Sequence, residues 1–142
     1  MNNHTLKLSA VALVAIHFIV VVLHSIAHDK LPVKATQAQL AFIVPVIVVA
    51  PLVAALVLVK FEKAGMVLLT ISMLGSLIFG IYYHFIADTI DHVAHVAHRE
   101  PLFWSHMFVA TSCLLAITEA AAAVVGLLWL KRQTQAVKDF PA

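Results

Sequence analysis

Four long apolar runs, separated by short charged stretches, limit what this chain can fold into. A helix needs about 20 predominantly apolar residues to cross the hydrocarbon core of a bilayer, and each run reaches that length. Inside a bilayer the backbone N–H and C=O groups must be satisfied within the protein, so such runs are expected to be helical. The sequence therefore predicts an all-α integral membrane protein, a four-transmembrane-helix bundle. The expected spans are residues 8–27, 40–59, 66–86 and 103–130.

The composition agrees with this class and excludes others. The chain is 63% hydrophobic and 11% charged, whereas a soluble domain is nearer half apolar and a quarter charged. We expect one membrane domain over residues 1–142, in contact with membrane lipid, with a polar tail at 131–142 that is loosely ordered from residue 133 onward. A net charge of +2 gives no reason to expect a nucleic-acid partner. The single cysteine, Cys113, excludes an intrachain disulfide and any cysteine-based zinc motif.

The distribution of Lys and Arg predicts the orientation, because cytoplasmic loops carry the excess of these residues. Six of the nine lie on the side of the two termini and the second loop, and three lie on the other side. Both termini are therefore expected in the cytoplasm of a bacterium, with the protein in the inner membrane. Pro45 and Pro51 interrupt the second run, and each should bend the helix because proline removes a backbone hydrogen bond.

Most of the histidines gather at the predicted outer end, which would be periplasmic or extracellular. An ionisable residue at membrane depth is costly, so each is a candidate for function. His24 and His28 are four residues apart on the first helix, the spacing at which two imidazoles can bind one ion. His17 lies on the same helical face, two turns deeper.

A histidine-rich segment, residues 87–100, follows the third span. If the third helix continued through it, His84, Asp88, Asp91, His95 and His98 would stay within about 40° of one line along the helix. His92 falls somewhat off that line. The opposite face of this segment is apolar, which predicts an amphipathic extension that lies on the membrane surface or caps the bundle.

These residues predict a metal site built from inward-facing side chains, as four-helix bundles commonly form. Imidazole with carboxylate suits copper, iron or zinc, and the two aspartates could bind the metal or orient a ligating histidine. The candidate ligands are His24, His28, His84, Asp88, Asp91, His92, His95, His98 and His106. If the cofactor were haem b instead, its ligands would come from His24, His28, His84 and His106.

A second polar pair is expected deeper in the bundle. Glu119 is the one acidic residue well inside a predicted span, and His17 should lie at a similar depth. A carboxylate at membrane depth is rarely left unpaired, so the two side chains are predicted to meet, directly or through water. With the outer histidines they would form a proton path from the cytoplasmic side.

The pattern H-x3-H at His24 and His28 and the pattern H-x2-H-x2-H at 92–98 resemble the histidine boxes of membrane di-iron desaturases and hydroxylases. The paired His-His of those boxes is absent, so no residue role is carried over. Four helices with opposed histidines also resemble the b-type membrane cytochromes, in which two histidines on different helices hold a haem. Here the histidines cluster at one end instead of forming two stacked pairs.

Three classes of function stay open from the sequence. The first is a non-haem metalloprotein of copper, iron or zinc, either an oxidoreductase, a metal-handling protein or a zinc hydrolase. The second is a b-type cytochrome that carries electrons from a quinol. The third is a proton-coupled transporter, pH sensor or accessory subunit without a metal. The small size fits a homo-oligomer or a subunit of a larger membrane complex.

Overall fold

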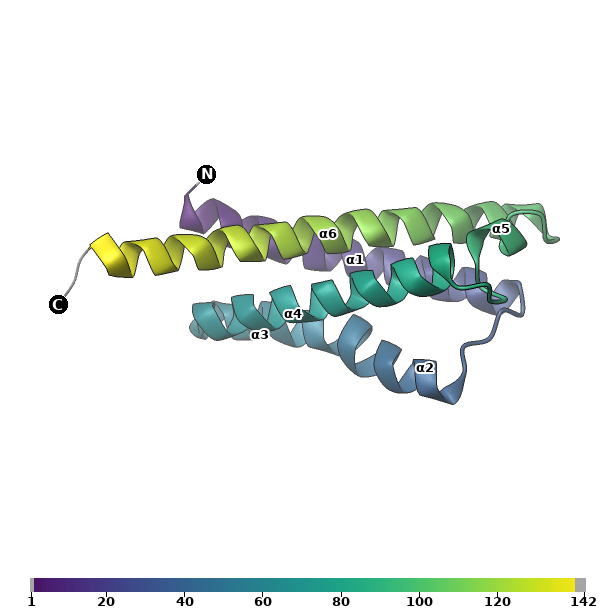
Figure 1. Ribbon diagram of the computed structural model, residues 1–142, viewed down its shortest axis with the longest axis horizontal. Helices are drawn as coiled ribbons and strands as arrows, with labels where there is room; N and C mark the ends of the chain where they lie inside the picture. Colours follow the sequence, from purple (N-terminus) through teal and green to yellow (C-terminus); the bar gives the residue numbers. More distant parts are fainter. Residues whose placement is uncertain (1, 140–142) are drawn as a thin grey trace.

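The computed structural model describes residues 2–139, with side chains described through residue 135, and forms an elongated bundle of four helical segments (Figure 1). The segments contain 28, 24, 25 and 34 residues and are long and apolar enough to cross a membrane. No strand occurs in the described part of the chain. The elements are α1 Asn3–Lys30, α2 Gln37–Phe42, η1 Ile43–Val49, α3 Ala50–Lys60, α4 Glu62–Ile81, η2 Tyr82–Ile86, α5 Val93–Val96 and α6 Leu102–Asp139.

Side-chain hydrogen bonds cap the starts of the first two helices. Asn2 caps α1 by accepting the Thr5 backbone N–H at 2.8 Å. Thr36 and Gln39 form a reciprocal capping box that begins α2. The last segment is longer than predicted, because α6 continues to Asp139. The expected loose order is therefore wrong for residues 133–139, which are helical, and the last three residues of the tail lie outside the described part.

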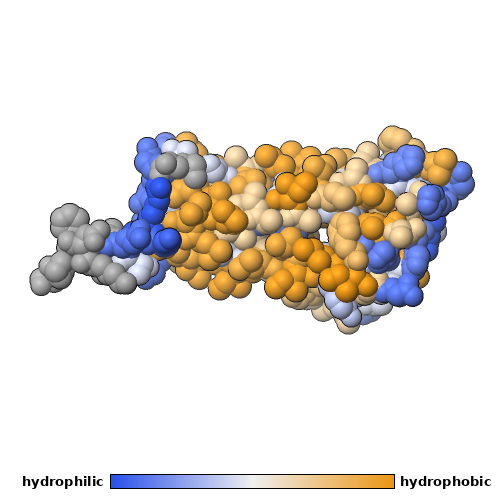
Figure 2. All heavy atoms as spheres, turned by 45° about the horizontal axis from the view of Figure 1, so that its top comes forward, coloured by the Kyte–Doolittle hydropathy of each residue, from blue (hydrophilic) through white to orange (hydrophobic). Residues whose placement is uncertain are grey.

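The surface distribution of side chains matches a membrane-spanning length. An apolar belt covers the middle of the face shown in Figure 2, and hydrophilic residues gather at both ends. At the end that holds Lys60 and Glu62, Lys7 of α1 forms an ion pair with Glu62 of α4. The main core lies toward this end, with Leu6, Met66 and Trp129 all nearly fully buried.

The second helical segment bends at its prolines, as predicted. Its middle seven residues, which include Pro45, form the π-helix η1, and Pro51 stands at the first turn of α3. Proline has no N–H to give to the preceding turn, so the regular ladder of hydrogen bonds is interrupted. As a result α3 packs along α4, whereas α2 diverges from the bundle at the end away from the termini (Figure 1).

The third helix does not continue through the histidine-rich segment, so that part of the prediction is wrong. It ends in the π-helix η2, and Ala87 is extended with ψ 135°. The chain then folds back, which brings the Thr89 hydroxyl oxygen to 3.2 Å from the Tyr83 carbonyl oxygen. Val96 of the short helix α5 is buried against Leu31 and Phe108. Burying Val96 on the end of the bundle removes apolar surface that a projecting helix would leave exposed.

Gly65 allows the closest approach between α3 and α4. A Cβ at this position would lie 2.6 Å from the Leu58 Cα and 2.9 Å from the Ala54 carbonyl oxygen, and backbone atoms cannot yield as a flexible side chain can. We predict that Gly65→Ala lowers the free energy of unfolding by about 1–3 kcal/mol, the usual cost of overpacking. Thermal unfolding in detergent, followed by circular dichroism, measures this. Gly75→Ala is the matched control, because its Cβ would meet Val46 at an ordinary 3.4 Å; an equal loss for both variants would contradict the prediction.

Candidate metal centre

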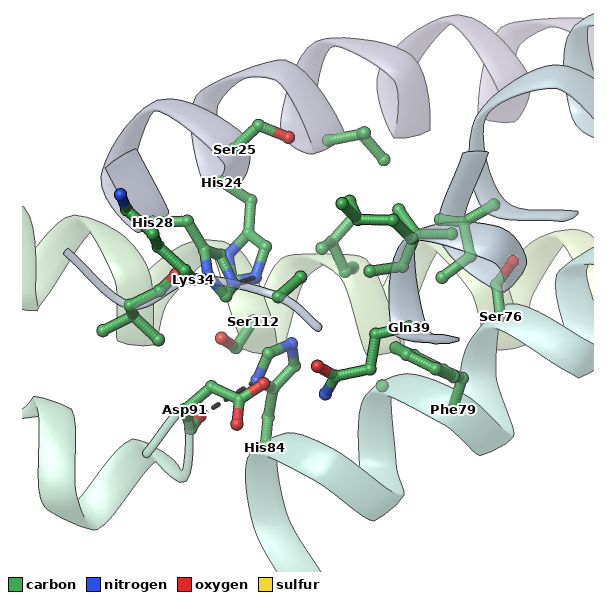
Figure 3. Close-up of a pocket in the computed structure, with 18 of the residues that line it drawn as sticks. His24, Ser25, His28, Lys34, Gln39, Ser76, Phe79, His84, Asp91 and Ser112 are labelled. Carbon is green, nitrogen blue, oxygen red and sulfur yellow. Dashed lines mark hydrogen bonds between the residues drawn. The ribbon is translucent and has the colours of Figure 1, made fainter. Parts of the chain in front are cut away.

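Three imidazoles meet near the splayed end of the bundle (Figure 3). His24 and His28 come from α1 and His84 comes from η2, and one ring nitrogen of each lies within 4.8 Å of the other two. The Nε2 atoms of His24 and His28 are 3.1 Å apart. His24 and His84 are buried and His28 is partly buried. The four-residue spacing places the first two on one face of α1, and the wide turn of η2 brings His84 to them.

The Nδ1 atom of each of the three rings contacts an oxygen of the protein. His28 Nδ1 lies 2.8 Å from the Val33 carbonyl, and His84 Nδ1 lies 3.0 Å from the Asp91 carbonyl. A carbonyl can only accept, so both Nδ1 atoms carry the hydrogen. His24 Nδ1 lies 2.9 Å from the Thr111 hydroxyl, which itself donates to the Met107 carbonyl at 2.7 Å. With its hydrogen on the Met107 carbonyl, the Thr111 hydroxyl accepts from His24 Nδ1; with its hydrogen on His24 Nδ1, it donates to the ring instead.

The two carbonyl contacts fix the position of the lone pair in two of the three rings. With hydrogen on Nδ1, the lone pairs of His28 and His84 are on Nε2. The Nε2 atoms of His24 and His28 lie 3.1 Å apart, so the free lone pair of His28 faces either a hydrogen on His24 Nε2 or a cation that both nitrogens share. Two nitrogens bound to one tetrahedral zinc ion at about 2.1 Å lie about 3.4 Å apart. Donation from the outer nitrogen to a protein oxygen is also the usual arrangement around a metal-bound histidine.

Phe108 holds the three rings together from α6. Its ring centroid lies 4.8 Å from that of His24, 4.8 Å from that of His28 and 5.3 Å from that of His84. The sequence analysis missed both Phe108 and Thr111. Neither residue type signals a metal site: a phenylalanine is ordinary in an apolar helix, and a threonine hydroxyl there usually bonds its own backbone.

A cavity of about 530 Å³ opens beside the cluster, a size typical of small-molecule sites. Its walls come mainly from α1, the second helical segment, α4 and α6. The three histidines and Asp91 line one end, together with Lys34 and Gln39 (Figure 3). Apolar side chains such as Ile43, Phe79 and Leu115 line its middle, and Glu119 also lines it. The divergence of α2 at its prolines leaves this space open.

The remaining predicted ligands do not join the cluster. His24, His28 and His84 form the one group of three or more candidate ligands found in the described part of the chain. His95 instead lies 3.2 Å from the exposed Asp88 carboxylate, and His92 accepts the Ala94 N–H at the start of α5. His98 and His106 are exposed. On α6 the neighbours Ser105 and Phe108 face inward, which turns His106 outward.

Asp91 contacts the site through its backbone carbonyl, whereas the sequence predicted a contact through its carboxylate. Its backbone carbonyl accepts from His84, while its carboxylate accepts from the Thr89 hydroxyl at 2.6 Å. The residue is buried and lines the cavity. The turn that replaces the predicted helix at 87–92 causes this, because it brings Asp91 back over His84.

His17 and Glu119 meet in the interior, as the sequence analysis expected. His17 Nδ1 lies 3.8 Å from Glu119 Oε1, and both side chains are almost completely buried. His17 Nε2 lies 3.1 Å from the Ile47 carbonyl and must donate to it. In a regular α-helix this carbonyl would accept from the N–H of residue 51, but Pro51 has none and Ile47 lies in the π-helix η1. His17 therefore gives the Ile47 carbonyl a donor from another helix at the point where the second segment departs from a regular α-helix.

Comparison of this chain with protein-family models, with curated proteins and with solved structures finds no match.

The bond from His17 to Ile47 yields a prediction about stability. His17→Ala leaves the Ile47 carbonyl without this donor, which should cost about 1–3 kcal/mol. Pro51→Ala restores an N–H at the helical position, so the same His17→Ala change should cost less in that background. Free energies of unfolding in detergent for the four proteins of this double-mutant cycle give the coupling. An equal cost in both backgrounds would show that Pro51 is not the reason for the contact.

Proposed function

We propose that this chain is a small integral membrane metalloprotein that holds one transition-metal ion, copper, iron or zinc, on the Nε2 atoms of His24, His28 and His84. The observation that carries the proposal is the meeting of three imidazoles, with one ring nitrogen of each within 4.8 Å of the other two. The Nδ1 atoms of His28 and His84 donate to carbonyl oxygens, which leaves their Nε2 lone pairs free, and the Thr111 hydroxyl can hold His24 in the same tautomer. With a cation, each hydrogen bond orients a ligand and raises its basicity.

Three protein ligands leave a further coordination position open to the cavity. Catalytic zinc sites commonly have three protein ligands and one position for water or substrate, whereas structural zinc sites are closed by four. The buried Asp91 beside the cluster adds a negative charge that would offset the charge of the ion. These features support an ion that exchanges a ligand, in redox chemistry, in metal handling or in hydrolysis, over an ion that only stabilises the fold.

The packing of the rings favours an ion over a haem. A haem held by two histidines would place a flat macrocycle between the imidazoles. The ring centroids of the three histidines are only 4.7 to 5.9 Å apart, and His24 packs edge-on against both of the others. No gap for a porphyrin exists within this cluster.

We also propose an orientation in the membrane. The side with both termini and the Lys60 loop faces the cytoplasm, since it carries most of the Lys and Arg residues. The metal centre then lies near the outer surface, and the cavity receives its ligands from that side. With so little chain outside the apolar belt, an outer partner protein or a second copy of the chain would dock mainly through the 87–100 segment.

Metal content tests the proposal. The full chain, purified without a tag in detergent and dialysed against zinc, should bind zinc through the cluster, and His84→Ala should lower the affinity by more than the 10–100-fold typical of losing a partner of a ligand. Equilibrium dialysis with elemental analysis measures the bound ion, and an absorption spectrum separates haem iron from non-haem iron. His106→Ala is the matched control, because His106 is exposed and should leave binding unchanged. Equal binding by wild type and the His84 variant would refute the assignment.

The hydroxyl of Thr111 provides a subtler test. Thr111→Val keeps the shape of the side chain but removes the hydroxyl that contacts His24 Nδ1, so the ring loses its fixed orientation. We expect a 10–100-fold weaker zinc affinity, measured by competition with a chromogenic chelator. Thr118→Val is the control, since the Thr118 hydroxyl also donates to a backbone carbonyl, that of Leu114 at 2.9 Å, but contacts no histidine in the described chain. A similar affinity for the two variants would argue against the role of Thr111.

A further inference from the structure

His17, deeper in the bundle, resembles His28 and His84 in that one ring nitrogen contacts a backbone carbonyl and the other has a free lone pair. His17 Nε2 donates to the Ile47 carbonyl, so the lone pair of the neutral ring is on Nδ1. In the described part of the chain this Nδ1 atom is buried and has no hydrogen-bond partner. Its ring is 2% exposed. A buried nitrogen with a free lone pair is costly unless something binds it.

The group that faces this lone pair is a carboxyl group. Glu119 Oε1 lies 3.8 Å from His17 Nδ1, and His17 is the one ion-pair partner found for Glu119 in the described chain. The separation exceeds the 2.7–3.2 Å of an N–H···O hydrogen bond. Two ligands bound to one zinc ion at about 2.0–2.2 Å lie about 3.4 Å apart in tetrahedral geometry, so the two atoms need to approach by only a few tenths of an ångström to share an ion.

The cavity connects the outer cluster to Glu119, while His17 lies behind Glu119 and is not one of the residues that line the cavity. Glu119 lines the same cavity as His24, His28 and His84. Along α1, His17 and His24 are seven residues apart, a rise of about 10 Å. Ions at the two places would be far beyond the about 3.5–4 Å of a bridged two-metal centre. They would therefore bind as separate ions in one shared space.

We propose that His17 and Glu119 form a second, inner site for a divalent transition-metal ion, which reaches it from the outer cluster through the cavity. The proposal goes beyond the metal centre described above and does not depend on it. Imidazole nitrogen and carboxylate oxygen supply two ligands. Ser76 and Ser112 also line the cavity, and each hydroxyl donates its hydrogen to a backbone carbonyl, which leaves the oxygen able to accept from water bound to the ion.

The distribution of charge supports two cation sites. Asp91 and Glu119 are the two buried acidic residues found in the described chain. One lies beside the outer histidines and the other faces the inner one, and both line the cavity. Each site therefore has one carboxylate to offset the charge of one cation. Beyond the inner pair, toward the termini, the bundle is filled by the apolar core around Met66 and Trp129. Glu119 is thus the member of the inner pair that an ion in the cavity would meet first.

Cobalt(II) is the probe for the test, because its visible absorption reports the ligands and its amount can be measured directly. The full-length protein in detergent is brought to equilibrium with saturating Co²⁺ and analysed for metal per chain. We expect two ions for wild type and one for Glu119→Gln, which keeps the size of the side chain but removes the charge. His17→Gln should also bind one, since its amide can still donate to Ile47. His84→Ala should lose the outer ion and keep the inner one, and Thr118→Val should keep both.

Each result separates the two sites. Two ions in both the Glu119 and the His17 variants would overturn the inner site. A single ion in wild type that is lost in His84→Ala and kept in Glu119→Gln would also overturn the inner site. The outer site would stand in that case, and His17 and Glu119 would be a pair joined by a proton. An ion lost in Glu119→Gln but not in His84→Ala would support the inner site and refute the outer one. Circular dichroism of every variant confirms that it is folded.

Discussion

The hydrogen bonds on the Nδ1 atoms are the constraint on which the outer site depends. An imidazole without a fixed tautomer can present either nitrogen, and three such rings would define no common point. Here the Val33 carbonyl, the Asp91 carbonyl and the Thr111 hydroxyl each hold one ring. They come from the loop after α1, the turn after η2 and the first third of α6. The site is therefore made only when these three parts of the chain are assembled.

The bend of the second helical segment provides the space for the cavity beside the three histidines. A straight helix packed along α4 would fill the volume that the cavity occupies. Pro45 and the π-helix η1 turn α2 away from the bundle, and Pro51 leaves the Ile47 carbonyl to accept from His17. The same two prolines thus open the cavity and fix the tautomer of the histidine in the interior. Backbone hydrogen bonds that cannot be made within the helix are the common cause of both effects.

The sequence predicted the four helical segments and the depth of the key side chains, because the length of an apolar run and the spacing of residues along a helix depend only on neighbouring residues in the chain. His24 and His28 share a face, and Glu119 lies level with His17, for this reason. The prediction failed for residues 87–100, where the burial of Val96 and the return of Asp91 over His84 decide the path. It also failed for His106, because depth along α6 was known but rotation about its axis was not. Thr111 and Phe108 carried no signal, since their roles exist only through contacts with other helices.

The bundle is held unevenly along its length, and this has a mechanical consequence. At the end with the termini, the core around Met66 and Trp129 and the ion pair of Lys7 with Glu62 tie the segments together. At the opposite end the start of α2 stands apart from its neighbours (Figure 1), whereas Phe42 at the other end of α2 stacks on Phe79 of α4. A rotation of about 10° at Pro45 would carry the start of α2, eight residues away, through about 2 Å. The start of α2 is thus the part of the cavity wall that the bundle holds least, and such a rotation at the π-helix would change its distance from the three histidines.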